Sequence, residues 1–199
     1  MSSKLTEPQV DDNEIWEPES ALDILIALLY AKGKQGNVGE SIEGITRLDK
    51  LMFLLSRNKY LESIVNKGYN FEADNFGPFA PELFDDIEAL KHENVLAVTS
   101  SRKPVNRTEV ADEDAVLDPL DDADPDDDYL VNCYVLTEEG MQIGKLIWNG
   151  LTPEQRTEIS RIKSTWQSKS LTELLHFVYR RYPETTEKSK IRDKILINR

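Results

Sequence analysis

The sequence has few of the features that stabilise secreted proteins or anchor membrane proteins. It contains one cysteine, Cys133, so a disulfide framework within the chain is excluded, which suits a reducing cytosol. The longest apolar run, residues 24–31, is far shorter than the ~20 residues that a membrane-spanning helix needs. The first residues contain no apolar segment of the kind found in secretory signals. We therefore expect a cytoplasmic protein that makes no membrane contact.

Residues that commonly carry catalysis are also scarce. The two histidines, His92 and His176, lie in no recognisable catalytic pattern, and we interpret each as a packed or surface side chain. Cys133 alternates within a predicted strand, which favours a buried structural thiol over a nucleophile. The short motifs of nucleotide-binding loops, zinc proteases and serine hydrolases are absent. The sequence predicts a protein that is not an enzyme, without catalytic, cofactor-binding or metal sites.

Negative charge is concentrated in one segment. Residues 111–128 hold ten acidic residues and no basic one, and removing these ten charges from the net charge of -13 leaves -3. From Asp122 the segment faintly resembles a calcium loop, but Asp127 and Cys133 stand where that loop needs glycine and glutamate. We interpret the segment as a solvated loop that repels anions, with weak, unspecific divalent-cation binding left open.

Length and composition indicate one main domain with two appendages. A chain of 199 residues is long enough to bury a core without metal or disulfide support. Residues 1–19 are polar and acidic, and we predict a flexible arm. Residues 20–183 form the predicted domain, with the acidic loop inserted at about 101–128. Residues 184–199 are predicted to be a basic tail.

Apolar spacing and capping residues predict most of the helices. Ser20 can cap a first helix over residues 21–31, whose apolar residues cover so much of its surface that it should be central to the core. Capping boxes begin two later helices, at Thr152 and Ser170. The remaining predicted helices cover about 44–57, 81–90 and 137–150, with a short turn near 60–65.

Alternating apolar residues predict three strands, over residues 69–73, 95–99 and 129–136. The last two could pair as a hairpin with a very long tip. The fold class is therefore mainly α with a small β-hairpin, an α+β domain that is compact and resembles a winged helix.

The stretch Phe76-Gly77-Pro78-Phe79 predicts a stiff corner between a strand and a helix. Gly77 permits unusual backbone angles and Pro78 stiffens the step. We expect Phe76 and Phe79 to anchor both sides of the corner in the core. Pro81 then begins the next helix, where its missing N–H costs nothing.

An ordered set of motifs resembles a known family. The stretches ITRLDKLMFLL, YNFEADNFGPFAPELFDDIEALKHENVL and YVLTEEG follow one another as in the Panacea domain, the SocA-like antitoxin domain. The match is carried by Lys50 and Leu51 in the first stretch and by the Phe76–Phe79 motif with Pro81 in the second. Ala80 departs from the family pattern, because a capping serine would be expected there. The resemblance implies an antitoxin or protein-binding regulator, and one described family member delivers its toxin partner to a protease. It implies no catalytic residues.

The C-terminus offers the other candidate contact surface. Basic residues that could meet DNA or an acidic protein are Arg180, Arg181, Lys188, Lys190, Arg192 and Lys194. Our first hypothesis is a non-enzymatic module that binds a toxin or effector protein and neutralises or delivers it. The alternative is a winged-helix DNA-binding regulator, although ten acids at the tip of its hairpin would repel DNA. The oligomeric state stays open.

Overall fold

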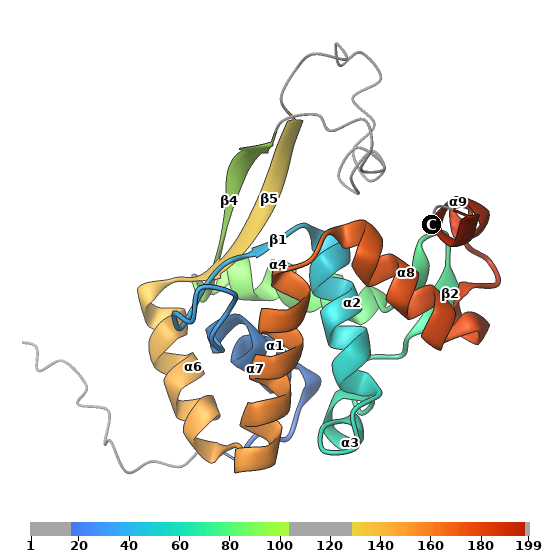
Figure 1. The fold of residues 1–199 in the computed structure, drawn as a ribbon. Helices are drawn as coiled ribbons and strands as arrows, with labels where there is room; N and C mark the ends of the chain where they lie inside the picture. Colours follow the sequence, from blue (N-terminus) through green and yellow to red (C-terminus); the bar gives the residue numbers. More distant parts are fainter. Residues whose placement is uncertain (1–16, 104–128, 198–199) are drawn as a thin grey trace, which may run out of the picture.

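The computed structural model describes residues 17–103 and 129–197 as a mainly helical α+β fold with two small antiparallel sheets (Figure 1). The elements are α1 (Ala21–Tyr30), β1 (Ile42–Glu43), α2 (Ile45–Ser56), α3 (Glu62–Val65), β2 (Glu72–Asp74), β3 (Gly77–Phe79), α4 (Pro81–His92), β4 (Leu96–Lys103), β5 (Tyr129–Leu136), α6 (Glu138–Gly150), α7 (Pro153–Gln167), α8 (Leu171–Arg181), η1 (Pro183–Thr186) and α9 (Arg192–Ile197). The predicted class, a compact and mainly helical α+β fold, is confirmed. In the described ranges, no helix combines the length and the apolar character that a membrane crossing requires.

The helix starts follow the local capping signals. The side chains of Ser20, Thr152 and Ser170 each accept the backbone N–H three residues later, at the start of α1, α7 and α8. In all three, the side chain of that later residue accepts the N–H of the cap residue in return. These reciprocal bonds satisfy N–H groups that a helix leaves without partners, which is why the predicted starts are confirmed.

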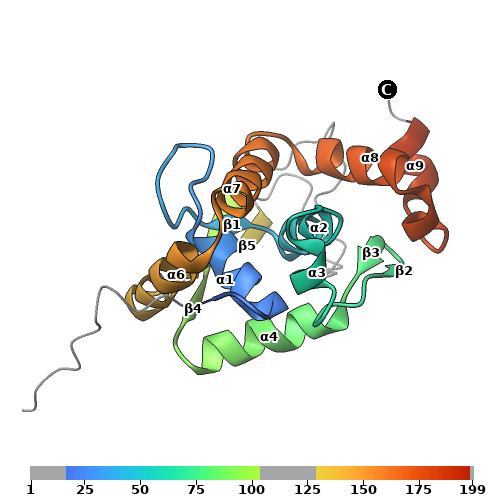
Figure 2. The ribbon, with the colours of Figure 1, turned by 90° about the horizontal axis from the view of Figure 1, so that it is seen from below.

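The core surrounds α1, which lies between α3, α6, α7 and strand β5. Seen from below, α1 is central, and α4 closes the side opposite α7 (Figure 2). Ile24, Leu25 and Leu28 have no exposed surface, as their place in the predicted central helix requires. Leu22 of the same helix is only half-buried.

The larger sheet has the strand order β1-β5-β4, and both pairs are antiparallel. The predicted hairpin is confirmed, with Thr99 opposite Cys133, and β1 joins its other side with Ile42 opposite Tyr134. Strand β4 continues to Lys103, past the predicted end at residue 99 and into the expected loop insertion. The rest of that insertion, residues 104–128, lies outside the described residues, as does the predicted arm up to residue 16.

The corner at residues 76–79 differs from the prediction. Gly77 and Pro78 do not end a strand but form β3, which pairs with β2 so that Ala73 lies opposite Pro78. Gly77 takes a φ of 92°, which a residue with a side chain rarely adopts, and this lets the chain reverse within two residues. Pro78 is tolerated because β3 is an edge strand.

The predicted basic tail is folded against the domain. It contains η1 and α9, and α9 packs against α8. Thr186 has no exposed surface and Ile195 is buried, while the Lys190 N–H donates to the Asn75 carbonyl between β2 and β3. Residues 184–197 therefore pack against the domain: η1 contacts β2 and β3, α9 contacts α8, and Ile195 belongs to the hydrophobic core.

Candidate functional site

His92 and Cys133, two of the few residues that commonly carry catalysis, lie in different elements of the described structure. Residues 17–103 and 129–197 hold no group of three or more His, Cys, Asp or Glu side chains that could bind a metal ion. His92 is exposed at the end of α4 and contacts Glu93, its neighbour in sequence. Cys133 is buried in β5 with its sulfur directed at the Val131 carbonyl, 3.7 Å away, as a structural thiol would be.

The Lys50 side chain connects the two stretches that carry the family resemblance. It is 2% exposed, and its Nζ lies 2.7 Å from Asp49 Oδ2 and 2.8 Å from the Pro78 carbonyl oxygen. The ammonium thus neutralises a buried carboxylate and satisfies the backbone of β3 at once. The second oxygen of that carboxylate, Asp49 Oδ1, is buried without a hydrogen-bond partner among the described residues. Burial raises the pKa of Asp49, and the charge of Lys50 opposes this rise.

Gly77 places the motif against α8. A Cβ atom at Gly77 would lie 2.8 Å from Cε1 of Tyr179, a ring that is almost completely buried. The Tyr179 hydroxyl lies 2.8 Å from Ser189 Oγ, which donates to the Asn75 carbonyl at 3.1 Å. The hairpin is therefore held between α2, α8 and the C-terminal segment, and its motif has a structural role.

The remaining motif residues partly depart from expectation. Pro81 is at the first position of α4, as predicted, and is exposed, while Leu51 is in the core. Phe76 and Phe79 are only half-buried and lie outside the main core, which corrects the prediction that they anchor the corner there. Phe79 packs on Phe84 of α4, with ring centroids 4.9 Å apart. In β3, Gly77 and Pro78 are buried, with Gly77 close to Tyr179 and the Pro78 carbonyl bound by Lys50, while Phe79 is partly exposed.

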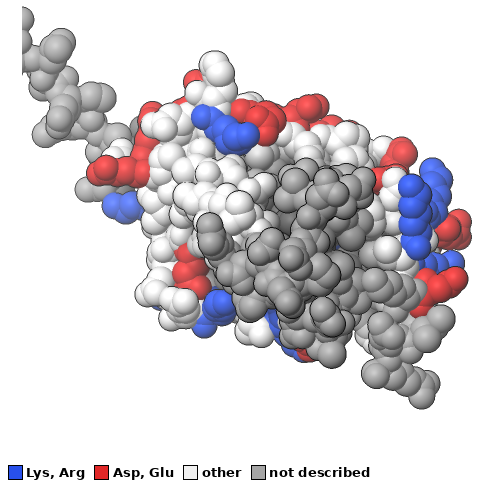
Figure 3. All heavy atoms as spheres, turned by 90° about the horizontal axis from the view of Figure 1, so that it is seen from above, with Lys and Arg blue, Asp and Glu red and all other residues white. Residues whose placement is uncertain are grey.

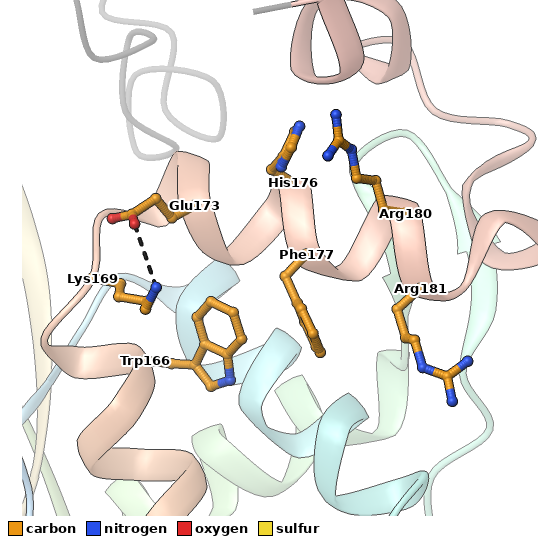
Figure 4. Close-up of a pocket in the computed structure, with 7 residues that line it drawn as sticks. All are labelled: Trp166, Lys169, Glu173, His176, Phe177, Arg180 and Arg181. Atoms are coloured by element: carbon orange, nitrogen blue, oxygen red, sulfur yellow. Dashed lines mark ion pairs between the residues drawn. The ribbon is translucent and has the colours of Figure 1, made fainter. Parts of the chain in front are cut away.

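A groove of about 440 Å³ lies along the exposed side of α8 (Figure 4). Seven side chains line it, two from the end of α7 and the turn after it and five from α8: Trp166, Lys169, Glu173, His176, Phe177, Arg180 and Arg181. We call it the α8 groove. On α8 the spacing of four residues places Phe177 above Arg181 on one stripe and His176 above Arg180 on the next.

Aromatic side chains form the apolar part of the α8 groove. The rings of Trp166 and Phe177 have centroids 4.8 Å apart, and the Phe177 side chain leaves 41% of its surface exposed. Phe177 lies off the buried face of α8, which Leu174, Leu175 and Val178 occupy. A large aromatic residue outside the apolar stripe of a predicted helix was the sequence feature that indicated this groove, and it was not recognised as one.

Cations flank these rings. The guanidinium groups of Arg180 and Arg181 are exposed, and neither forms an ion pair within the described ranges. Lys169 Nζ lies 5.7 Å from the Trp166 ring centroid and 3.5 Å from Glu173 Oε1. In Figure 4, the His176 and Arg180 side chains project from one side of α8, and the Phe177 and Arg181 side chains project from the other.

The structure assigns the predicted basic contact residues to different places. Arg180 and Arg181 line the groove, whereas Lys188 and Lys190 are exposed in the connection between η1 and α9. Arg192 begins α9 and is half-buried, and the side chain of Lys194 lies outside the described part. Seen from above, Lys and Arg side chains gather on the side of the molecule where α8 and α9 lie (Figure 3).

Lys163 is a buried lysine that the sequence did not point to as a candidate. It has no exposed surface, and its Nζ donates to the carbonyls of Leu29 and Ala31 at 2.7 and 2.8 Å. These carbonyls end α1 and have no helical partner, so the lysine caps the central helix. Burial lowers the pKa of Lys163 to about 7, and Glu40 opposes this shift. Its place four residues after Ile159, on the buried stripe of α7, was the signal for it.

Comparisons with known proteins add no relative. No protein-family model matches the chain, and searches of curated proteins and of solved structures find no match.

Proposed function

We propose that this protein is a non-enzymatic interaction module that binds a toxin or other effector protein and neutralises or delivers it. The resemblance to the Panacea domain motivates the proposal. A cytoplasmic location belongs to the same proposal, since the single cysteine and the kind of partner suit that compartment.

The observation that carries the proposal is the open α8 groove. It combines an exposed phenylalanine, a tryptophan and two arginines without carboxylate partners among the described residues. Aromatic residues and arginine are the types most enriched at the centres of protein interfaces. A partner that covers Phe177 would bury apolar surface and give both guanidinium groups acceptors, which supports a protein-binding role.

DNA binding is the second candidate, favoured by the strand order of the larger sheet. In a winged helix, a short strand after the first helix pairs with the second strand of a later hairpin, and the helix before that hairpin reads DNA. Here β1 pairs with β5, and α4 precedes the β4–β5 hairpin. However, α4 has four carboxylates between Glu82 and Glu88 and only one lysine, Lys91. Phosphate contacts supply most nonspecific affinity for DNA, so this helix would be repelled.

Co-purification from the native host tests the proposal. The full-length chain with an affinity tag is purified at low salt, and the proteins that co-purify with it are identified by mass spectrometry. We expect one effector protein at near-stoichiometric yield, and recovery of the chain alone would contradict the proposal.

A retardation assay separates the second candidate. The full-length chain is mixed with the DNA upstream of its own reading frame at low salt, where electrostatic binding is strongest. We expect no shift, and a shift that persists against competitor DNA would favour the DNA-binding alternative.

A further inference from the structure

We propose that the α8 groove binds an acidic peptide segment of the partner, with an apolar side chain of that segment seated against Phe177 and its carboxylates paired with Arg180 and Arg181. This assignment rests on the proposed function, because it names the site and the chemistry of partner recognition.

The apolar part of the groove calls for a hydrophobic side chain. Phe177 is among the few large apolar side chains with substantial exposure in the described ranges, and Trp166 supports one side of its ring. The volume of about 440 Å³ accommodates one or two large side chains of a bound segment. A binder that covers both rings removes apolar surface from water, which favours association.

The charges of the groove select an acidic segment. Arg180 and Arg181 offer planar donor groups that match carboxylates bidentately, and both line the groove together with Phe177. Glu173 lines the groove but is already engaged, because it accepts the Ser170 N–H at 3.0 Å and contacts Lys169. Hydrogen bonding to the Ser170 backbone lowers the pKa of Glu173, so it stays ionised at the helix start. The two arginines remain as the groove's open charges.

The groove is held in shape before any partner arrives. Arg47 of α2 donates from Nη1 to the carbonyls of Trp166 and Lys169, which fixes the turn between α7 and α8. The reciprocal bonds between Ser170 and Glu173 fix the first turn of α8. Little ordering is then required on this side of the interface, which favours binding of a short segment.

A peptide fits these observations better than a nucleic acid strand. Trp166 and Phe177 contact each other, so no gap between them is open to a base. The net charge of -13 also opposes long-range attraction of a polyanion, whereas a short acidic segment needs only the local cations.

Fluorescence anisotropy with defined probes tests the assignment. The probe is a short fluorescein-labelled peptide of alternating glutamates and leucines with one phenylalanine. Comparison probes replace its apolar residues by serine or its glutamates by lysine, and a short single-stranded DNA measures nucleic acid binding. We expect the full-length chain to bind the first probe, with affinity that falls as salt rises, and to bind the three others at least about tenfold more weakly.

Exposed substitutions locate the binding. Arg180→Glu with Arg181→Glu, and separately Phe177→Ser, should each weaken binding of the first probe about tenfold or more. The double Lys59→Glu, Lys67→Glu variant changes net charge equally at exposed sites elsewhere. Tyr60→Ser removes a ring with similar exposure, 39%. Both controls should bind as the unmodified chain does.

Equal binding by the groove variants and their controls would overturn the assignment, as would no binding of the first probe or tighter binding of the DNA. The same variants are carried through co-purification from the host. If the double arginine variant still binds the partner, the groove is not the binding site, but the proposed function is not contradicted. Failure of the unmodified chain to recover any partner would instead count against the proposed function, while groove-dependent peptide binding would still support the chemistry of the groove.

Discussion

Replacement of Lys50 by methionine should destabilise the protein strongly, because the Lys50 side chain is almost completely buried. Methionine fills a similar volume but leaves the Asp49 carboxylate and the Pro78 carbonyl without the ammonium that now lies 2.7 and 2.8 Å away. Removal of one partner from a buried ion pair costs about 3–5 kcal/mol of unfolding free energy, because an uncompensated charge stays buried. We expect a loss in that range for Lys50→Met.

The neighbouring carboxylate supplies the control. In the double variant Asp49→Asn, Lys50→Met no charge remains, and the cost should fall to about 1–3 kcal/mol for the unpaired Pro78 carbonyl. The deficit of the single variant should also shrink at acidic pH. Burial already raises the pKa of Asp49 above its ordinary 3.8, and without Lys50 the folded state favours the protonated form still more. The folded variant then binds more protons than the unfolded one, so its stability falls as pH rises above about 4 and recovers as pH falls.

Urea unfolding monitored by circular dichroism, at neutral pH and near pH 5, measures these differences. A single variant within about 1 kcal/mol of the unmodified chain would refute the structural role of Lys50, judged against ordinary surface substitutions. A double variant as unstable as the single one would show that the unpaired charge is not the cause.

Three further outcomes follow from the same packing. Gly77→Ala should lower the unfolding free energy by about 2–4 kcal/mol, because the added Cβ lies 2.8 Å from Tyr179 and the φ is unfavourable for alanine. Gly36→Ala has a similar φ, 83°, but open space around the added Cβ, so it should lower the unfolding free energy by only about 1 kcal/mol. Similar melting temperatures for the two variants would argue against the close approach of Gly77 to Tyr179. The pKa of Lys163 in the folded state is about 7, against an ordinary 10.5, so the unfolded state binds more protons between these values. The unfolding free energy of the unmodified chain should therefore rise by about 3 kcal/mol between pH 7 and 9.5, measured relative to the Lys163→Met variant. Parallel pH profiles of the two proteins would refute the lowered pKa. Phe177→Ser should change the unfolding free energy by less than about 1 kcal/mol, because the ring is 41% exposed, and a larger loss by thermal unfolding would place Phe177 in the core instead.

The parts of the fold that sequence could predict are those set by neighbouring residues. Ser20, Thr152 and Ser170 satisfy the first N–H groups of their own helices, so the signal and its effect lie within four residues. The β4–β5 hairpin was predictable from alternation even though a long segment separates its strands. Strand β3 was not, because a three-residue strand that contains proline has no periodic signal, and its pairing depends on the φ of Gly77.

The candidate site was less predictable, because it forms between elements. Arg180 and Arg181 were identified from charge alone, but the groove that they line also contains Trp166, which packs on Phe177 across the turn between α7 and α8. The contacts of the motif residues were not predictable either, because they join segments that are far apart in the sequence. Lys50 and Gly77 were read as identifiers of a fold, and only the structure brings the lysine ammonium to the backbone of β3 and the glycine to the ring of Tyr179.

Hydroxyl-radical footprinting of the complex recovered from the host tests the central claim most directly, since it reports side-chain exposure with and without the partner. Phe177 and Tyr60 start with nearly equal exposure, 41% and 39%, so each is the reference for the other. We expect labelling of Phe177 to fall sharply when the partner is bound, and labelling of Tyr60 to stay unchanged. Unchanged labelling of Phe177 in an intact complex would contradict a partner-binding role for the α8 groove.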